Sequence, residues 1–172
     1  MKKIITIGLI LGLTGCSLFT SKVEANTNIN GSVESRCSIN TDTAGYYGNP
    51  NSYTLNTTAS DGGQKPILRL DVSLASAYIG AITWPTSFSS SPSLSDSVAF
   101  TGGVAVVQVS ASGMDGYQAA STVTNSGSTR NYNLSTAGST WFQVTSQAVY
   151  GGNKAFPSGS YATTVVAECI AQ

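Results

Sequence analysis

Two segments of this 172-residue chain, one near each end, alternate strictly between two faces. In the first, one face carries Ile29, Gly31, Val33, Ser35, Cys37 and Ile39. In the second, which runs from Tyr161 to Ile170, one face carries Tyr161, Thr163, Val165, Ala167 and Cys169. Successive side chains of a strand point to opposite faces, so this period of two predicts half-buried β-strands at both ends of the fold.

Residues 1–25 are typical of a secretory signal. Met1-Lys2-Lys3 is followed by an apolar run from Ile4 to Phe19, and Val23-Glu24-Ala25 forms a small-residue cleavage pattern before Asn26. We therefore expect export across the inner membrane and a single domain over residues 26–172. Leu13-Thr14-Gly15-Cys16 also resembles a bacterial lipobox. The alternative is therefore lipidation at Cys16, which would make the protein an outer-membrane lipoprotein.

Either route leaves Cys37 and Cys169 as the remaining pair of cysteines. In an oxidising compartment, two such cysteines predict one disulfide, the alternative being two unrelated buried thiols. A disulfide requires the two Cα atoms to come within about 7 Å of each other. The first and last strands are therefore expected to be neighbours or to face each other across the core.

The composition excludes several classes of function. Residues 26–172 carry five basic and seven acidic side chains, too few positive charges to neutralise a run of phosphates, so nucleic-acid binding is disfavoured. The chain has no histidine, which excludes Ser-His-Asp and Cys-His triads and histidine-bearing metal sites. We interpret the four candidate catalytic carboxylates, Asp61, Asp71, Asp96 and Asp115, as solvated turn or strand residues. We expect no enzyme, no cofactor and no metal.

Between the two ends, short apolar runs alternate with glycine, proline, asparagine and serine, and helix signals are almost absent. Residues 40–64 are expected to be mostly loop with a short strand near Tyr53–Asn56, and residues 86–97 a flexible loop. Further strands are predicted at 68–74, Tyr78–Trp84, Val98–Phe100, Val104–Val109, Tyr117–Val123, Arg130–Leu134 and Trp141–Tyr150, with a glycine bulge or turn at Gly102-Gly103. This pattern predicts an all-β antiparallel sandwich of seven to nine strands.

These features together resemble the chaperone–usher pilins, the fimbrial subunit family that includes spore-coat-U-like proteins. The resemblance implies an immunoglobulin-like sandwich that lacks its last strand. A periplasmic chaperone fills the gap first, and the N-terminal segment of the next subunit then replaces it. Ile29, Gly31 and Val33 would belong to the donor strand. Gly159, fourteen positions from the end of the sequence, would precede the groove strand that carries Tyr161, Val165 and Ala167.

The chain also departs from the pilin pattern. Ala171 stands where the family has a penultimate tyrosine, and the expected disulfide joins the first strand to the last instead of two early strands. Only eleven residues lie between Ala25 and Cys37, so one long strand would have to serve both as donor and as first strand of the domain.

The sequence thus predicts a structural subunit of a surface fimbria or pilus. Its partners would be other copies of itself or related pilins, a periplasmic chaperone and an outer-membrane usher. The alternative is a self-complete outer-membrane lipoprotein or secreted sandwich that binds a partner or a host or surface glycan. Trp84 and Trp141 could supply a sugar-stacking surface, although two tryptophans in a β-domain are more often core residues.

Overall fold

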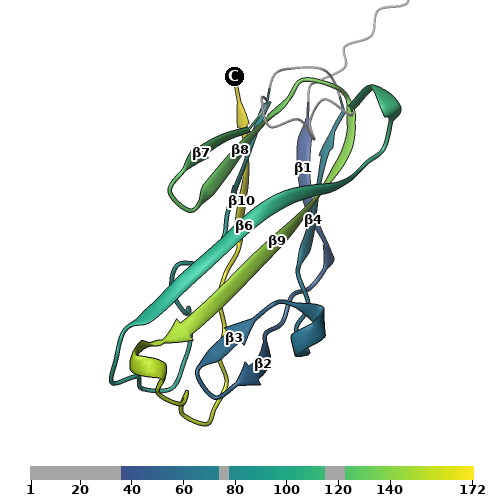
Figure 1. The fold of residues 1–172 in the computed structure, drawn as a ribbon. Coiled ribbons are helices and arrows are strands. Elements are labelled where there is room, and N and C mark those ends of the chain that lie inside the picture. The colour runs from purple at the N-terminus through teal and green to yellow at the C-terminus, as the bar shows by residue number, and fades with distance from the viewer. Residues whose placement is uncertain (1–35, 74–77, 115–122) are drawn as a thin grey trace, which may run out of the picture. The chain divides into compact units, whose positions relative to one another are not determined.

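The computed structural model describes residues 36–73, 78–114 and 123–172. The chain divides into two units, Met1–Ser32 and Val33–Gln172, and all described residues belong to the second. Within that unit the strands form two antiparallel sheets, so the predicted all-β sandwich is confirmed (Figure 1). No helix among the described residues is long and apolar enough to cross a membrane.

The first sheet is built around the long strand β9. Strand β6 pairs with one edge of β9, while β4 and β3 lie end to end along the other edge. Strand β1 then pairs with β4, and β2 with β3. The bounds are β1 Cys37–Thr43, β2 Gly48–Asn51, β3 Thr54–Asn56, β4 Ile67–Val72, β6 Val98–Val109 and β9 Gly138–Tyr150.

The second sheet has four strands in the order β10-β5-β8-β7. Their bounds are β5 Tyr78–Thr83, β7 Val123–Ser126, β8 Thr129–Leu134 and β10 Val166–Ala171. Strand β5 is an inner strand, as its continuous apolar run predicts. The described residues thus hold ten strands, where seven to nine were expected; β3 matches the short strand expected near Tyr53–Asn56, whereas β2 was not expected.

The core fills the space between the two sheets. It combines buried side chains of the first sheet (Leu68, Leu70, Val72, Phe142 and Val144) with those of the second (Ile82, Tyr132 and Leu134) and with Met114. The rings of Tyr132 and Phe142 lie 4.7 Å apart, which places β8 over β9. A Cβ atom on Gly80 would contact Leu70, which places β5 over β4. By the same stacking order, β10 lies over β1.

Several predicted patterns are confirmed. Strand β4 buries alternate side chains, as the spacing of Leu68, Leu70 and Val72 predicts. From Tyr161 to Ile170 the side chains alternate between half-buried and exposed. Only the part from Val166 onward pairs as a regular strand. The segment before it forms a single bridge, between Ala162 and Ser90.

Other boundaries differ from the prediction. Strand β1 continues to Thr43, whereas residues from 40 onward were expected to be loop. Asn125 and Ser126 belong to β7, and Gly138 begins β9, although each was predicted to separate strands. Pairing with β4 or β8 keeps these polar and small residues extended, although their own propensities do not favour strands. Leu74, Asp115 and most of 117–123 lie outside the described residues.

Gly102-Gly103 does not split a strand. Both residues lie inside the continuous strand β6 and pair in register with Ser146 and Thr145, while the irregularity of this ladder lies between Val106 and Gln108. A Cβ atom on Gly102 would overlap the indole of Trp84, which packs across the sandwich from the end of β5. Gly102 is therefore needed for space and not for a turn.

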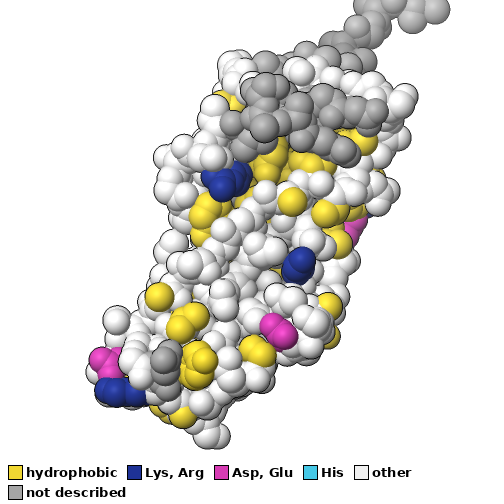
Figure 2. Space-filling view, viewed as in Figure 1, with side chains coloured by type: hydrophobic (Ala, Val, Ile, Leu, Met, Phe, Trp, Pro, Cys, Tyr) yellow, Lys and Arg dark blue, Asp and Glu magenta, His cyan; other side chains and the backbone are white. Residues whose placement is uncertain are grey.

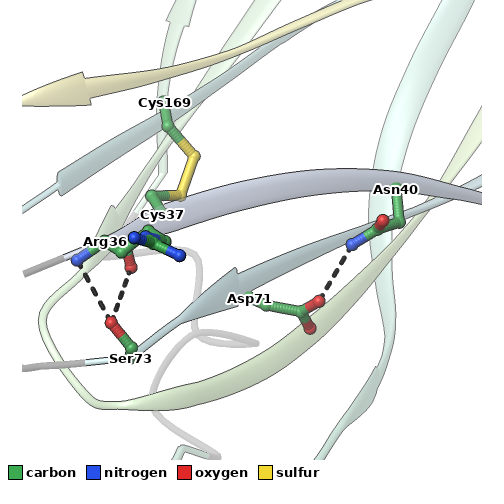
Figure 3. The surroundings of a disulfide bond; sticks show 6 residues. All are labelled: Arg36, Cys37, Asn40, Asp71, Ser73 and Cys169. Carbon is green, nitrogen blue, oxygen red and sulfur yellow. Dashed lines mark hydrogen bonds between the residues drawn. A yellow bond between two sulfur atoms is a disulfide. The ribbon is translucent and has the colours of Figure 1, made fainter.

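The predicted disulfide is present. Cys37 of β1 and Cys169 of β10 are bonded, with their Cα atoms 6.2 Å apart (Figure 3). Beside the bond, the backbone of Arg36 exchanges hydrogen bonds with Ser73, and the Asn40 side chain donates to Asp71 at 2.9 Å. These contacts fix β1 on β4, and the disulfide connects the edges of the two sheets. The bond closes a loop with a sequence separation of 132 residues.

Charged side chains are few and scattered over the face shown in Figure 2, with apolar side chains exposed between polar atoms. Five large apolar side chains are exposed among the described residues: Ile39, Tyr46, Val107, Val166 and Ile170. All except Val107 lie on β1, on β10 or in the loop that follows β1. Most of these exposed apolar side chains thus lie on or next to the edge strands β1 and β10, with Val166 and Ile170 on the face of β10 that points away from the core.

The neighbouring glycines of β6 provide a matched test of the packing. We expect Gly102→Ala to destabilise the protein by about 1–3 kcal/mol, because the added methyl group would overlap the indole of Trp84 and the carbonyl oxygen of Thr145. Gly103→Ala should change the stability by less than about 0.5 kcal/mol, since its Cβ would meet only Thr145 Oγ1 at 3.4 Å. Urea denaturation of both variants measures the difference; equal effects would contradict the assignment.

Candidate functional site

Both strands at one side of the sandwich have an unpaired edge. Among the described residues, β1 pairs only with β4, and β10 pairs only with β5. The disulfide shows that these two edges lie on the same side of the unit. A row of free backbone N–H and C=O groups at a sheet edge is a template for a further strand. This side of the sandwich, which we call the open side, is the candidate site.

The inner face of β1 is exposed on the open side. Ile39 pairs directly with Leu70, and cross-strand partners in an antiparallel ladder point to the same face. Leu70 is fully buried in the core, yet Ile39 remains 39% exposed. Thr41, opposite the buried Leu68, is exposed as well. The inner face of β1 therefore lacks the cover that a complete sandwich would give it.

A groove of about 850 Å³ opens on this side. Its floor comes from three strands of the first sheet through Leu55, Leu68 and Val144, all of which are buried. One wall is formed by Thr41 and the loop after β1, and the other by the chain from Phe156 to Val165. Not one of the described residues that line the groove carries a charged side chain.

Tyr47 spans the groove. Its hydroxyl shares hydrogen bonds with Ser146 Oγ of β9 at 2.7 Å and with Thr163 Oγ1 of the opposite wall at 3.2 Å. The loop that carries Tyr47 packs closely against the chain before β4. The approach at Gly48 is so close that a Cβ atom there would overlap the backbone of Asp61 and Gly63. Tyr47 therefore links the loop after β1, the floor and the β10 side of the groove.

An aromatic cluster supports the end of the groove away from the disulfide. The Phe156 ring lies 5.1 Å from the rings of both Tyr150 and Tyr161, and Phe88 packs against Tyr161 at 5.1 Å. The Tyr161 hydroxyl donates to the carbonyl oxygen of Pro157 at 2.7 Å. Burial raises the pKa of the Tyr161 phenol above its ordinary value, and the nearby Tyr150 adds to the rise. Tyr161 therefore stays neutral at physiological pH, and this wall of the groove remains uncharged.

The residues predicted for the groove strand lie on the open side. Gly159, Tyr161 and Val165 line the groove, and Ala167, two residues further along, packs against the core beside Cys169. The predicted donor residues Ile29, Gly31 and Val33 lie outside the described residues, and so does Cys16.

The two tryptophans lie apart from the groove, and neither is fully buried. Trp84 packs against the core, and the Arg130 guanidinium lies 5.2 Å from its ring centroid. Trp141 donates through its indole N–H to Asp42, with the Arg69 guanidinium 5.9 Å from the ring. Both rings therefore already have cationic partners.

Each of the described candidate carboxylates has its own partner. Asp61 accepts from Asn56 at 2.7 Å, Asp71 accepts from Asn40 and Arg69, and Asp96 pairs with Lys154. Asp115 lies outside the described residues. The part of the chain that the structure describes holds no group of three or more side chains that could ligate a metal ion.

Sequence reasoning missed Tyr46 and Tyr47, since residues 40–64 were interpreted as mostly loop. Tyr46 is 57% exposed at the mouth of the groove. A signal was present, because two adjacent tyrosines stand between Gly45 and Gly48 in an otherwise polar stretch. Large aromatic side chains in a loop, flanked by glycines that allow close packing, indicate that the loop is part of a built surface.

Comparison of the chain with protein-family models, with curated proteins and with solved structures found no match.

The adjacent tyrosines test whether Tyr47 holds the groove together. We expect Tyr47→Phe to destabilise the protein by about 0.5–1.5 kcal/mol and to speed amide exchange near Thr163, since both hydroxyl contacts are lost. Tyr46→Phe, at an exposed ring, is the control and should leave both quantities unchanged. Denaturation and hydrogen exchange of the two variants provide the comparison; unaltered exchange near Thr163 in Tyr47→Phe would rule out the link.

Proposed function

We propose that this protein is a structural subunit of a bacterial surface fimbria, assembled by strand donation between copies. The observation that carries the proposal is the exposed inner face of β1 beside the unpaired edge of β10. Ile39, whose cross-strand partner is fully buried, is 39% exposed there. An apolar face bordered by free backbone groups has the character of a site for an added strand.

The physical gain from an added strand is large. Each backbone hydrogen bond it makes with β10 contributes about 0.5–1.5 kcal/mol. Covering the inner face of β1 and the groove floor adds about 25 cal/mol per Å² of apolar surface removed from water. Because many such contacts form together, one inserted strand would give a complex that dissociates very slowly. That property suits a polymer of identical subunits.

The chain itself offers a suitable occupant. Residues 26–33 have no charged side chain, and Glu34 follows them. The lining of the groove in the described part of the chain is likewise uncharged. Inserting a charged segment would bury charges without partners, at a cost of several kcal/mol per charge. An uncharged segment with the alternating residues Ile29, Gly31 and Val33 avoids this cost.

The proposal also includes export of the subunit and its binding by a chaperone. A subunit with an open apolar side would aggregate before assembly unless that side were covered. We therefore include a secretory signal over residues 1–25, a periplasmic chaperone that occupies the groove first, and an outer-membrane usher. The Cys37–Cys169 bond suits the oxidising compartment that this route passes through. The proposed action consists of binding alone, without a catalytic step.

Deleting residues 26–33 from the mature protein tests the donor. We expect the deletion variant to remain monomeric, whereas the full mature chain forms ladders that survive in unboiled detergent gels. A synthetic peptide of residues 26–33 should bind the deletion variant, because its groove is unaltered. Ladders that persist without residues 26–33 would refute the proposal.

Two exposed apolar residues test the acceptor. We expect Ile39→Asp to reduce polymer formation at least tenfold, because it would place an unpaired charge beneath the incoming strand. Val107→Asp is the matched control, since Val107 is similarly exposed, at 45%, but lies on β6 away from the groove. Both variants should fold, as measured by thermal denaturation. Equal polymer yields, measured by size-exclusion chromatography, would contradict the assignment of the inner face of β1 as part of the acceptor.

A further inference from the structure

A second hollow, of about 700 Å³, lies on the outer face of the first sheet. Its floor is one row of side chains across β1, β4 and β9, in which Thr43 pairs with Ile67 and Ile67 pairs with Gln143. Residues of the turn 57–65 and the ring of Tyr46 complete the lining. The hollow is thus formed by three strands, a turn and one aromatic side chain.

This hollow and the groove lie on opposite faces of the same sheet. The floor of the groove includes Leu68 and Val144, whereas the hollow is lined by the residues that precede them, Ile67 and Gln143. Successive side chains of a strand point to opposite faces. Tyr46 lines both sites from the edge of the sheet. The hollow therefore has a floor that the proposed donor strand would not cover.

Tyr46 is held in its exposed position by the backbone around it. Its N–H and C=O groups exchange hydrogen bonds with the backbone of Gln64, at 3.0 and 2.9 Å. A Cβ atom on the preceding Gly45 would overlap Pro66, so the chain on that side is closely packed as well. The ring is 57% exposed nevertheless. A fixed aromatic ring offers a ligand a flat apolar surface together with a phenol that can hydrogen-bond.

Lys65 is the charged residue among those that line the hollow. It is half-buried, and no carboxylate of the described residues forms an ion pair with it. The acidic side chains next to the lining already have partners, since Asp42 pairs with Arg69 and Asp61 accepts from Asn56. A free ammonium group in a partly enclosed site favours a ligand with a negative charge, because a charge-assisted hydrogen bond is stronger than a neutral one.

The other polar side chains of the hollow favour a ligand rich in hydroxyl groups. Four of them make no side-chain hydrogen bond within the described part of the chain: Thr43, Thr58, Gln64 and Gln143. Hydroxyl and amide groups can both donate and accept, as sugar hydroxyls do. The backbone N–H groups of residues 61–63 are used inside the turn, so they are not available to pair with an extended peptide.

We propose that this hollow binds a saccharide that carries a carboxylate. The apolar face of the sugar ring stacks on Tyr46, its carboxylate pairs with Lys65, and its hydroxyl groups hydrogen-bond the side chains of Gln64 and Gln143. This binding activity goes beyond strand donation and does not depend on it.

The test compares matched sugars on the full mature chain. The probes are methyl β-D-glucuronide, its neutral counterpart methyl β-D-glucoside, the methyl glycoside of N-acetylneuraminic acid, and acetate as a carboxylate without a sugar ring. Saturation-transfer NMR titrations give the affinities, and they work equally well on a monomer and on a polymer. The variants are Lys65→Gln, Tyr46→Ala and Tyr46→Phe. Lys154→Gln is the matched control, because Lys154 pairs with Asp96 outside the hollow.

At least one acidic saccharide should bind about tenfold or more tightly than the neutral glucoside and than acetate, as one charge-assisted hydrogen bond allows. Lys65→Gln should abolish this preference, whereas Lys154→Gln should keep it. Tyr46→Ala should weaken binding about fivefold or more, and Tyr46→Phe, which retains the ring, should stay within about twofold of the unaltered protein. The C–H protons on one face of the bound sugar should receive more saturation than those on the other.

Several results would overturn the proposal: no binding of either acidic saccharide, equal affinity for the acidic and neutral sugars, or an unchanged preference in Lys65→Gln. Acetate that binds as tightly as the saccharides would also overturn it, because the site would then recognise the anion alone. If Tyr46→Ala does not fold, the saturation pattern on the unaltered protein decides, and equal saturation of both faces would exclude stacking. Polymer yield should be the same in Lys65→Gln, so failure of this site leaves the proposed function standing.

Discussion

The Cys37–Cys169 bond is the constraint on which the open side of this sandwich depends. It is the covalent connection between the edge strands β1 and β10, and it joins one sheet to the other. Strand β10 otherwise rests on β5 alone among the described strands. A last strand with one partner would fray readily, since its hydrogen bonds face solvent on one side. The bond holds that strand over β1 and so keeps the groove in shape without filling it.

The groove keeps its shape because its walls are cross-linked at both ends by different means. At one end the link is the disulfide, and at the other it is Tyr47 together with the aromatic cluster around Phe156. A site held in this way would lose little conformational entropy on binding a partner strand, because its walls are already fixed. Its lining of hydroxyl, aromatic and small apolar side chains suits a backbone with alternating side chains better than a charged ligand.

The features predictable from the sequence were those set by local period and by residue chemistry. Alternation alone identified β4 and the faces of the last strand, and the cysteine pairing followed from the number of cysteines left after the expected signal. The continuity of β6 could not be found in this way. Gly102 resembles a turn residue until Trp84, from another strand, is known to occupy the space beside it. Likewise, the role of Tyr47 depends on Ser146 and Thr163, which lie 99 and 116 residues away in sequence.

An edge strand that accepts a partner must also reject unwanted ones, since free edges promote aggregation. Two features of the groove would limit what can add beside β10. The uncharged groove disfavours segments that carry charges, because burying them without partners is costly. Tyr47 occupies the space above Ser146, so an incoming strand must fit around its ring. The lining of the groove would thus restrict which extended chains can add at this edge, whereas a bare row of backbone groups would accept any of them.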